Sequence, residues 1–192
     1  MKPFQPFYNM VSPLSEKTWA DILPLFHQRN LLAGEFFVKE QEIATEIAFL
    51  ETGVVRAYFT NESGNEYNKQ FFVAPSSIGA YTSLLTKKPN RIAQQALTDC
   101  VIWSCKFSDL TAFYEKHHDL ERLARKIAEH YFLEKEKKEL EIVLIEATQR
   151  YQLFQQEFPT LEQRISQYHI ASYLGITATQ LSRIRRKLAN KS

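Results

Sequence analysis

The sequence contains few cysteines, and this scarcity excludes several kinds of metal centre. Its 192 residues include only Cys100 and Cys105. Two thiolates in one chain cannot supply a four-cysteine iron–sulfur cluster or structural zinc site. In the segment CVIWSCKF their odd spacing would place them on opposite faces of a strand, so we expect two buried thiols and no disulfide.

Long apolar runs are also missing. No continuous apolar stretch approaches the roughly 18 residues that a membrane-spanning helix needs. The N-terminal segment MKPFQPFYNM has neither the apolar core nor the small-residue cleavage site of a signal peptide. We therefore expect a cytoplasmic protein with no membrane partner. The hydrophobic fraction of 44% and the charged fraction of 24% are those of an ordinary folded protein.

Charge is distributed unevenly along the chain. The net charge is only +2, yet the segment from Leu161 onward has six basic residues against the single acid Glu162. This segment therefore carries +5 and the remainder −3. Such asymmetry indicates a polyanionic partner, although a short cationic stretch alone is more often a solvated face. The six basic residues are Arg164, Arg183, Arg185, Arg186, Lys187 and Lys191.

From about Phe36 to Phe107, short runs of aromatic and β-branched residues alternate with turn residues, which predicts an antiparallel β domain. The stretch NESGN predicts a hairpin connection, and Gly53 a tight turn or bulge. Several short strands at this spacing favour a sandwich or barrel. The region contains no histidine. It therefore lacks the clustered ligands of a metal-dependent jelly-roll enzyme such as a cupin, and we expect no enzymatic activity and no metal.

The five histidines of the chain show no pairing typical of haem ligation. His117 and His118 are adjacent in the sequence, but on a helix they would face different directions. All five are expected at the surface or in an interface.

A long helix is predicted after the β domain, because residues 119–158 include neither Gly nor Pro. Unbroken, it would reach about 55 Å, more than a small domain can cover. Apolar positions recur at spacings near 3.5 residues, which predicts a two-stranded dimer contact; the alternative is packing against the chain's own β domain. The predicted dimer residues are Leu120, Leu123, Ile127, Leu133, Leu140 and Leu144.

The segment SQYHIASYLGITATQLSRIRRKL predicts two short helices joined by a tight turn. Gly175 is expected to end the first helix, and Ile176 to act as an apolar plug. Thr177 is expected to cap the second helix, with Gln180 at the reciprocal capping position. This spacing is typical of a helix-turn-helix.

The second of these helices has an apolar face and a cationic face. Leu181, Ile184 and Leu188 share the apolar face. A recognition helix requires this division, because one side docks on the scaffold while arginines on the other pair with guanine edges or phosphates. The alternative is that the cations merely complement the negative end of the helix dipole and keep the surface soluble. The polar face holds Thr179, Arg183, Arg186 and Asn190, with Lys187 nearby.

A β domain, a long helix and the motif IASYLGIT…LSRIRRKL together resemble the Crp/Fnr transcription factors, in particular the short forms that lack strands after the recognition helix. The resemblance covers nearly the whole chain from about Gly34. It implies an α+β fold with an N-terminal antiparallel β jelly roll similar to the cyclic-nucleotide-binding domain. The implied domains are a sensor at residues 1–118, a long dimerisation helix at 119–148 and a helix-turn-helix domain at 149–192.

By this resemblance the protein is expected to be a homodimeric, sequence-specific transcriptional regulator. Its implied partners are a palindromic site in double-stranded DNA, a second copy of the chain and RNA polymerase. Ala178, Thr179 and Arg183 would occupy base-reading positions. Familiar members carry larger, charged residues where this chain has Ala178 and Thr179, so their DNA preference does not transfer. The expected DNA-binding residues are Gln167, Thr177, Ala178, Thr179, Gln180, Ser182, Arg183, Arg186 and Lys187, of which Gln167, Thr177 and Gln180 match positions that usually touch phosphate.

The family's phosphate cassette reads Phe-Gly-Glu, about ten residues, then Arg-(Ser/Thr)-Ala. The matching stretch SIGAYTSLLTKKPNRIAQQAL keeps Gly79 but has Ala80 in place of the Glu and Arg91 at the arginine position. A methyl group cannot accept the ribose hydroxyl, so binding would lose about 1.5 to 3 kcal/mol. We therefore expect no cyclic AMP and no cofactor, and either another small ligand or none. Gly79, Ala80 and Arg91 remain the candidate ligand residues.

An alternative from another class is a protein-interaction or sensor module that keeps a cyclic-nucleotide-binding-like domain but does not bind DNA specifically. Binding to nonspecific duplex separates the two hypotheses, because phosphate contacts release counterions and are weakened by salt, whereas protein contacts need not be.

Overall fold

The computed structural model describes residues 1–190, and Lys191, which the charge count includes, lies outside the described residues. The chain forms two compact units. Residues 1–57 and 71–133 make the first unit, whereas residues 58–70 belong with the chain from residue 134 onward in the second. A β hairpin and the long helix therefore contribute to both units.

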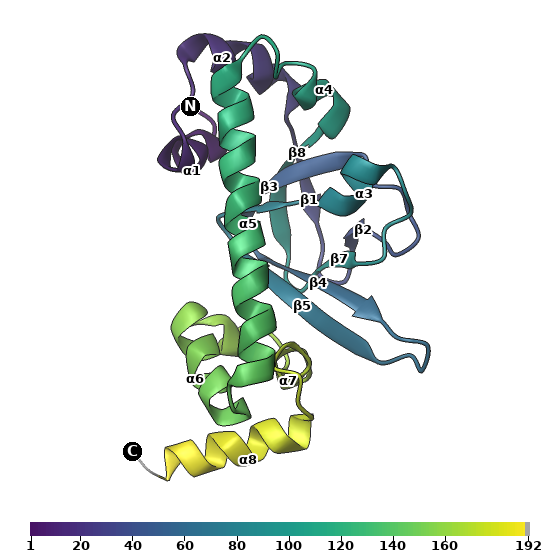
Figure 1. Ribbon diagram of the computed structural model, residues 1–192, viewed down its shortest axis with the longest axis vertical. Helices are drawn as coiled ribbons and strands as arrows, with labels where there is room; N and C mark the ends of the chain where they lie inside the picture. Colours follow the sequence, from purple (N-terminus) through teal and green to yellow (C-terminus); the bar gives the residue numbers. More distant parts are fainter. Residues whose placement is uncertain (191–192) are drawn as a thin grey trace. The chain divides into compact units, whose positions relative to one another are not determined.

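Two four-stranded sheets, with the strand orders β1-β8-β3-β6 and β2-β7-β4-β5, form a sandwich, which is one of the two predicted architectures (Figure 1). The pairs β1–β8, β3–β8, β3–β6 and β2–β7 are antiparallel. The β region begins at His27, earlier than the predicted Phe36, because β1 pairs with β8 although it is mostly polar. The strands are β1 His27–Leu31, β2 Phe36–Val38, β3 Glu46–Thr52, β4 Val54–Thr60, β5 Glu66–Val73, β6 Ser76–Ile78, β7 Ala93–Ala96 and β8 Cys100–Lys106.

Both predicted turns are confirmed. Gly53 joins β3 to β4 at φ +98, and a Cβ there would meet Cys100 and the Asp99 carbonyl oxygen. Only glycine fits without strain at such a position. Between β4 and β5, the Asn61 amide donates to the Asn65 carbonyl at 3.0 Å, and the Asn61 side chain accepts from the Asn65 amide at 2.9 Å.

The two cysteines on β8 are buried thiols that form no disulfide with each other, and each is 2% exposed. Cys100 packs in a cluster with Leu50 and Ile102, whereas Cys105 packs with Phe49 and Trp103 in a different one. The prediction of two thiols on opposite faces is therefore confirmed. Burial raises the pKa of Cys105 to about 12, so this thiol is not a reactive nucleophile.

The N-terminal helices of the first unit pack beside the long helix α5, His118–Leu144, around an aromatic cluster (Figure 1). Phe4 is fully buried, with its ring centroid 4.7 Å from that of Phe26 and 5.6 Å from that of Trp103. Aromatic side chains of this size dominate the burial energy of a core. The remaining helices of this unit are α1 Phe4–Val11, α2 Glu16–Ile22, η1 Leu23–Leu25, α3 Tyr81–Thr86 and α4 Phe107–Thr111.

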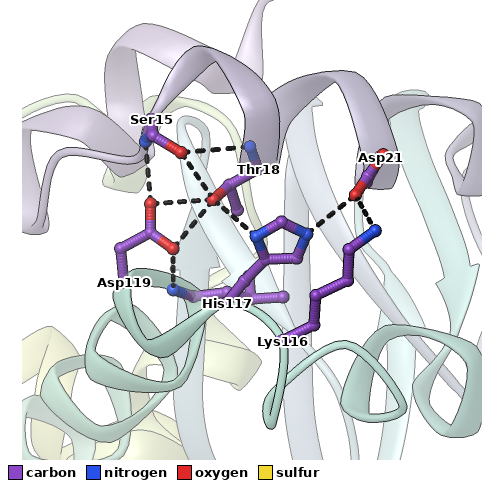
Figure 2. Close-up of polar contacts among 7 residues, drawn as sticks. Ser15, Thr18, Asp21, Lys116, His117 and Asp119 are labelled. Carbon is purple, nitrogen blue, oxygen red and sulfur yellow. Dashed lines mark hydrogen bonds and ion pairs between the residues drawn. The ribbon is translucent and has the colours of Figure 1, made fainter.

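A polar network fixes the start of α5 to α2 (Figure 2). The Asp119 carboxylate accepts from the Ser15 amide and from the Thr18 hydroxyl, each at 2.8 Å. The His117 ring lies between Thr18, 3.1 Å from Nδ1, and Asp21, 2.8 Å from Nε2. His117 therefore does not lie at the surface, because the residue is 6% exposed and both of its ring nitrogens have hydrogen-bond partners inside the unit.

The long helix ends before the predicted boundary at residue 148, because the chain breaks at Ile145 and Glu146 and α6 then runs over Ala147–Glu157. The predicted domain boundary at 148/149 therefore falls inside α6. Three further elements follow and gather with α6 at the end of α5 (Figure 1). They are η2 Leu161–Gln163, α7 Gln167–Tyr173 and α8 Ala178–Ala189.

Within the second unit, the outer part of the β4–β5 hairpin is hydrogen-bonded to α7. The Ser172 hydroxyl accepts from the Asn68 amide at 2.9 Å and donates to the Glu66 carbonyl at 2.8 Å. The Asn68 side chain donates to the His169 carbonyl at 3.1 Å. These contacts explain why residues 58–70 belong with the C-terminal helices and not with the rest of the sandwich.

Candidate nucleic-acid interface

The turn between α7 and α8 has the predicted local structure. Gly175 adopts φ +67, and Thr177 is the N-cap of α8. The Thr177 hydroxyl accepts from the Gln180 amide at 3.1 Å, while the Gln180 side chain accepts from the Thr177 amide at 2.9 Å. This reciprocal capping box leaves other amides of the first turn of α8 directed away from the helix, where they can receive an anion.

The apolar sides of α7 and α8 are buried. Ile170, Leu174 and Leu181 are fully buried, whereas Ile184 and Leu188 are half-buried. Tyr173 of α7 packs on Phe154 of α6, with 5.8 Å between ring centroids. Because α8 docks through Leu181, its opposite side must face solvent.

All nine predicted DNA-binding residues are exposed. Arg183, Arg186 and Lys187 share the outward side of α8, and none of the three has an acidic partner within residues 1–190. Their charge is therefore available to a ligand. The exposed residues are Gln167, Thr177, Ala178, Thr179, Gln180, Ser182, Arg183, Arg186 and Lys187.

Arg185 differs from the other cations of α8. It is half-buried, and its Nε lies 3.9 Å from Glu162 Oε1. Glu162 also accepts from the Tyr151 hydroxyl at 2.6 Å. Burial, together with the neighbouring Glu162 carboxylate, raises the pKa of Tyr151 to about 12. Arg185 thus faces the scaffold, a role that the sequence pattern alone did not indicate.

The predicted dimer residues divide into two groups. Leu120 and Leu123 are 3% and 5% exposed and pack in the aromatic core of the first unit, with Ile127 packed partly against it. Leu120 and Leu123 are therefore covered by their own unit, whereas Ile127 is half-buried and its place in a dimer contact stays a prediction. Leu133, Leu140 and Leu144 are instead 60%, 54% and 73% exposed. We define the apolar stripe of α5 by its exposed residues Phe132, Leu133, Leu140, Val143 and Leu144.

The candidate ligand residues do not form a polar site. Ala80 is 8% exposed and packs with Val38, Leu84 and Phe107. A Cβ at the half-buried Gly79 would come within 3.1 Å of the Ile47 side chain, whereas Arg91 is exposed. A buried polar group lies on β7, where Gln94 is 4% exposed and its side-chain oxygen accepts no hydrogen bond from residues 1–190. Sequence reasoning missed Gln94.

The Thr18–His117–Asp21 chain has the residue types of a hydrolytic triad but not its accessibility. Thr18 is fully buried, so no substrate can reach its hydroxyl. Hydrogen bonding from Lys116, and then from His117, lowers the pKa of Asp21. Across residues 1–190, no three His, Cys, Asp or Glu side chains are grouped so that they could hold a metal ion. Nor has any helix of that range the length and apolar character needed to cross a membrane.

Comparison with known proteins identifies the sandwich. Residues 28–117 match the family described as the cyclic nucleotide-binding domain. The first unit thus contains a jelly roll of the cyclic nucleotide-binding type, as the resemblance implied. No curated protein sequence matches the chain.

Three solved structures share the fold of most or nearly all of the chain. FixK2 from Bradyrhizobium japonicum is 20% identical, with a TM-score of 0.78 over 86% of this chain and 85% of its own. A putative Crp/Fnr-family transcriptional regulator from Eubacterium rectale is 14% identical, with a TM-score of 0.76 over 99% and 89%. The c-di-GMP-responsive global regulator CLP from Xanthomonas campestris is 14% identical, with a TM-score of 0.74 over 92% and 93%. These likenesses describe the fold of the cyclic nucleotide-binding domain, the long helix and the helices that follow.

Proposed function

We propose that the protein is a homodimeric transcriptional regulator of the Crp/Fnr type that binds a palindromic site in double-stranded DNA through α8. The observation that carries the proposal is the division of α8. Leu181 is fully buried, whereas Arg183, Arg186 and Lys187 are exposed and free of acidic partners within residues 1–190. α7, the turn at Gly175 and α8 then act as a helix-turn-helix, with α8 entering the major groove.

The apolar stripe of α5 supports the dimer. Val143 and Leu144 are 79% and 73% exposed, which is costly on a helix unless a partner covers them. Most of this stripe and α8 lie in the same compact unit. Pairing two stripes about a two-fold axis would present two α8 helices to successive major grooves, about 34 Å apart.

Two of the solved structures named above are described as a putative transcriptional regulator of the Crp/Fnr family and as a global regulator of gene expression, which favours a regulatory role here. The proposal assigns the jelly roll an effector other than cyclic AMP, or none, because the Ala80 methyl group packs in the core and cannot accept a ribose hydroxyl. RNA polymerase as a partner stays a prediction from the resemblance.

The first test is the salt dependence of binding to a labelled duplex of mixed sequence, followed by fluorescence anisotropy. Affinity should fall steeply with salt, and Arg186→Ala should reduce the logarithmic slope by about one. Arg125→Ala is the matched control, because it removes the same charge from an exposed position on α5. Absent or salt-insensitive binding would contradict the proposal and favour the alternative, an interaction or sensor module that does not bind DNA specifically.

A second test separates base reading from phosphate contact. On a duplex selected by the wild-type protein, Arg183→Ala should cost about 1 to 3 kcal/mol and relax the preference at one position per half-site. Lys187→Ala should instead weaken all duplexes alike. If both variants lose the same affinity on every sequence, Arg183 is not a base-reading residue.

A further inference from the structure

One arginine of α6 connects the end of α5 to the turn that precedes α8. The Arg150 guanidinium donates to the Leu174 carbonyl from Nε at 3.2 Å and from Nη2 at 2.9 Å. Its Nη1 donates to the Ile142 carbonyl at 3.4 Å and also to the Ile145 carbonyl. All four contacts lie within the second unit.

The partners of Arg150 are chemically suited to a guanidinium. Leu174 is the C-cap of α7, and Ile142 and Ile145 lie at the end of α5. The last carbonyls of a helix lack intrahelical partners and carry the negative end of the helix dipole. Arginine offers five donors in a rigid planar fork, so one side chain can serve both helix ends, which lysine cannot do. Across residues 1–190, Arg150 forms no ion pair with a carboxylate.

A second contact joins the same two helices. Lys138 of α5 lies with Nζ 3.8 Å from the ring centroid of Tyr173, and 3.2 Å from Glu141 Oε2. Burial lowers the pKa of Lys138, while the Glu141 carboxylate acts in the opposite direction. Lys138 thus contacts a side chain of α7. Arg150 instead binds the backbone carbonyl of Leu174, the last residue before the turn into α8.

The chain between Leu174 and the N-cap of α8 is short. It consists of Gly175, at φ +67 with open space beside it, and the half-buried Ile176. Fixing the Leu174 carbonyl therefore fixes where α8 begins. The other end of the Arg150 contact lies beside Val143 and Leu144, the most exposed part of the apolar stripe.

We propose that Arg150 is a positioning residue that fixes α8 relative to the dimer-forming end of α5, and thereby sets the separation of the two recognition helices. The proposal deepens the function proposed above and rests on it for its consequence on DNA. Its structural part does not depend on DNA, because α5, Arg150 and α8 belong to one protomer.

The structural part is tested by the distance between spin labels at Glu136→Cys on α5 and Ala189→Cys on α8, measured in full-length protein diluted with unlabelled chains. Both positions are exposed, whereas the native thiols are 2% exposed and do not compete for the label. The wild-type background should give one narrow distribution. In Arg150→Gln the narrow distance distribution should be replaced by a broad one. In Arg150→Lys the distribution should be broader than in the wild-type background but narrower than in Arg150→Gln. Arg125→Gln, a matched exposed arginine on α5, should leave it unchanged.

The functional part is tested with duplexes selected by the wild-type protein, carrying either one half-site or two half-sites moved apart by single base pairs. Arg150→Gln should keep the wild-type affinity for one half-site and lose the preference for one spacing. Equal losses on single and paired half-sites would overturn the positioning role, because Arg150 would then act through DNA contact or overall folding.

The outcomes separate the two proposals. A label distance that stays narrow in both Arg150 variants overturns the positioning role even if DNA binding is intact. A distance that broadens while the wild-type protein binds no duplex supports the positioning role and contradicts the proposed function. If Arg150→Gln does not fold, Arg150→Lys decides, because it keeps the charge but cannot reach both helix ends.

Discussion

The two halves of α5 differ in the exposure of their leucines. Leu120 and Leu123 are 3% and 5% exposed, whereas Leu140 and Leu144 are 54% and 73% exposed. The first half completes the core of the unit that contains the sandwich, and the second half carries leucines that residues 1–190 leave more than half exposed. One apolar repeat thus serves intramolecular packing up to Ile127 and is exposed from Phe132 onward, where we propose the intermolecular contact.

The largest expected effect is on the free energy of unfolding, and it compares the two halves of α5 directly. Leu120→Ala should lower the free energy of unfolding by about 2 to 5 kcal/mol, because it leaves a cavity in the aromatic core. Leu144→Ala should change the free energy of unfolding by no more than about 0.5 kcal/mol, when it is measured at protein concentrations below the dimer dissociation constant. Urea denaturation of both variants checks the pair. Similar losses would mean that the second half of α5 is also covered within the protomer.

Leu144→Lys should act on assembly and not on the protomer. Two like charges would face each other across the two-fold axis, so the dimer dissociation constant should rise about a hundredfold. Sedimentation equilibrium measures this, and Leu144→Met is the control that keeps an apolar side chain. A dimer of unchanged affinity in Leu144→Lys would place the interface elsewhere.

The smallest expected effect concerns the start of α5. Burial acts to raise the pKa of Asp119, but hydrogen bonds from Ser15, Thr18 and Leu120 outweigh it and hold that pKa below its ordinary value of 3.8. A carboxyl with a lowered pKa contributes stability that is present above its unfolded pKa and is lost as the pH falls through the folded value. Asp119→Asn should therefore cost about 1 to 2 kcal/mol at pH 7 and weaken the loss of stability below about pH 4.

Unfolding measured between pH 2 and 7 checks the Asp119 prediction. The wild type and Asp119→Asn should converge at the acid end, because the wild-type carboxyl is protonated there. A constant difference over the whole range would mean that the Asp119 charge is not what anchors α5.

Local signals in the sequence predicted local structure well. The capping box of Thr177 and Gln180 and the turn at Gly175 involve residues within a few positions of one another, so their chemistry is readable from the sequence. The same holds for Gly53 and for the Asn61–Asn65 turn. The faces of α8 followed from helical periodicity alone.

Contacts between residues that are far apart in the sequence could not be predicted from it. Nothing near Arg150 in the sequence indicates that its partner is the carbonyl of Leu174, and Glu162 lies far from Arg185 along the chain. The break after Leu144 carries no Gly or Pro, so helix propensity alone predicted continuation. An apolar repeat likewise does not say whether Leu120 meets its own core or a second chain, because both demand the same side chains.

The account depends on two α8 helices acting together, and the most direct test is the selection of bound duplexes from a random pool by the wild-type protein. The account predicts enrichment of an inverted repeat whose half-sites are about one helical turn apart. Enrichment of unrelated sequences, or of a single half-site without its inverted copy, would contradict it.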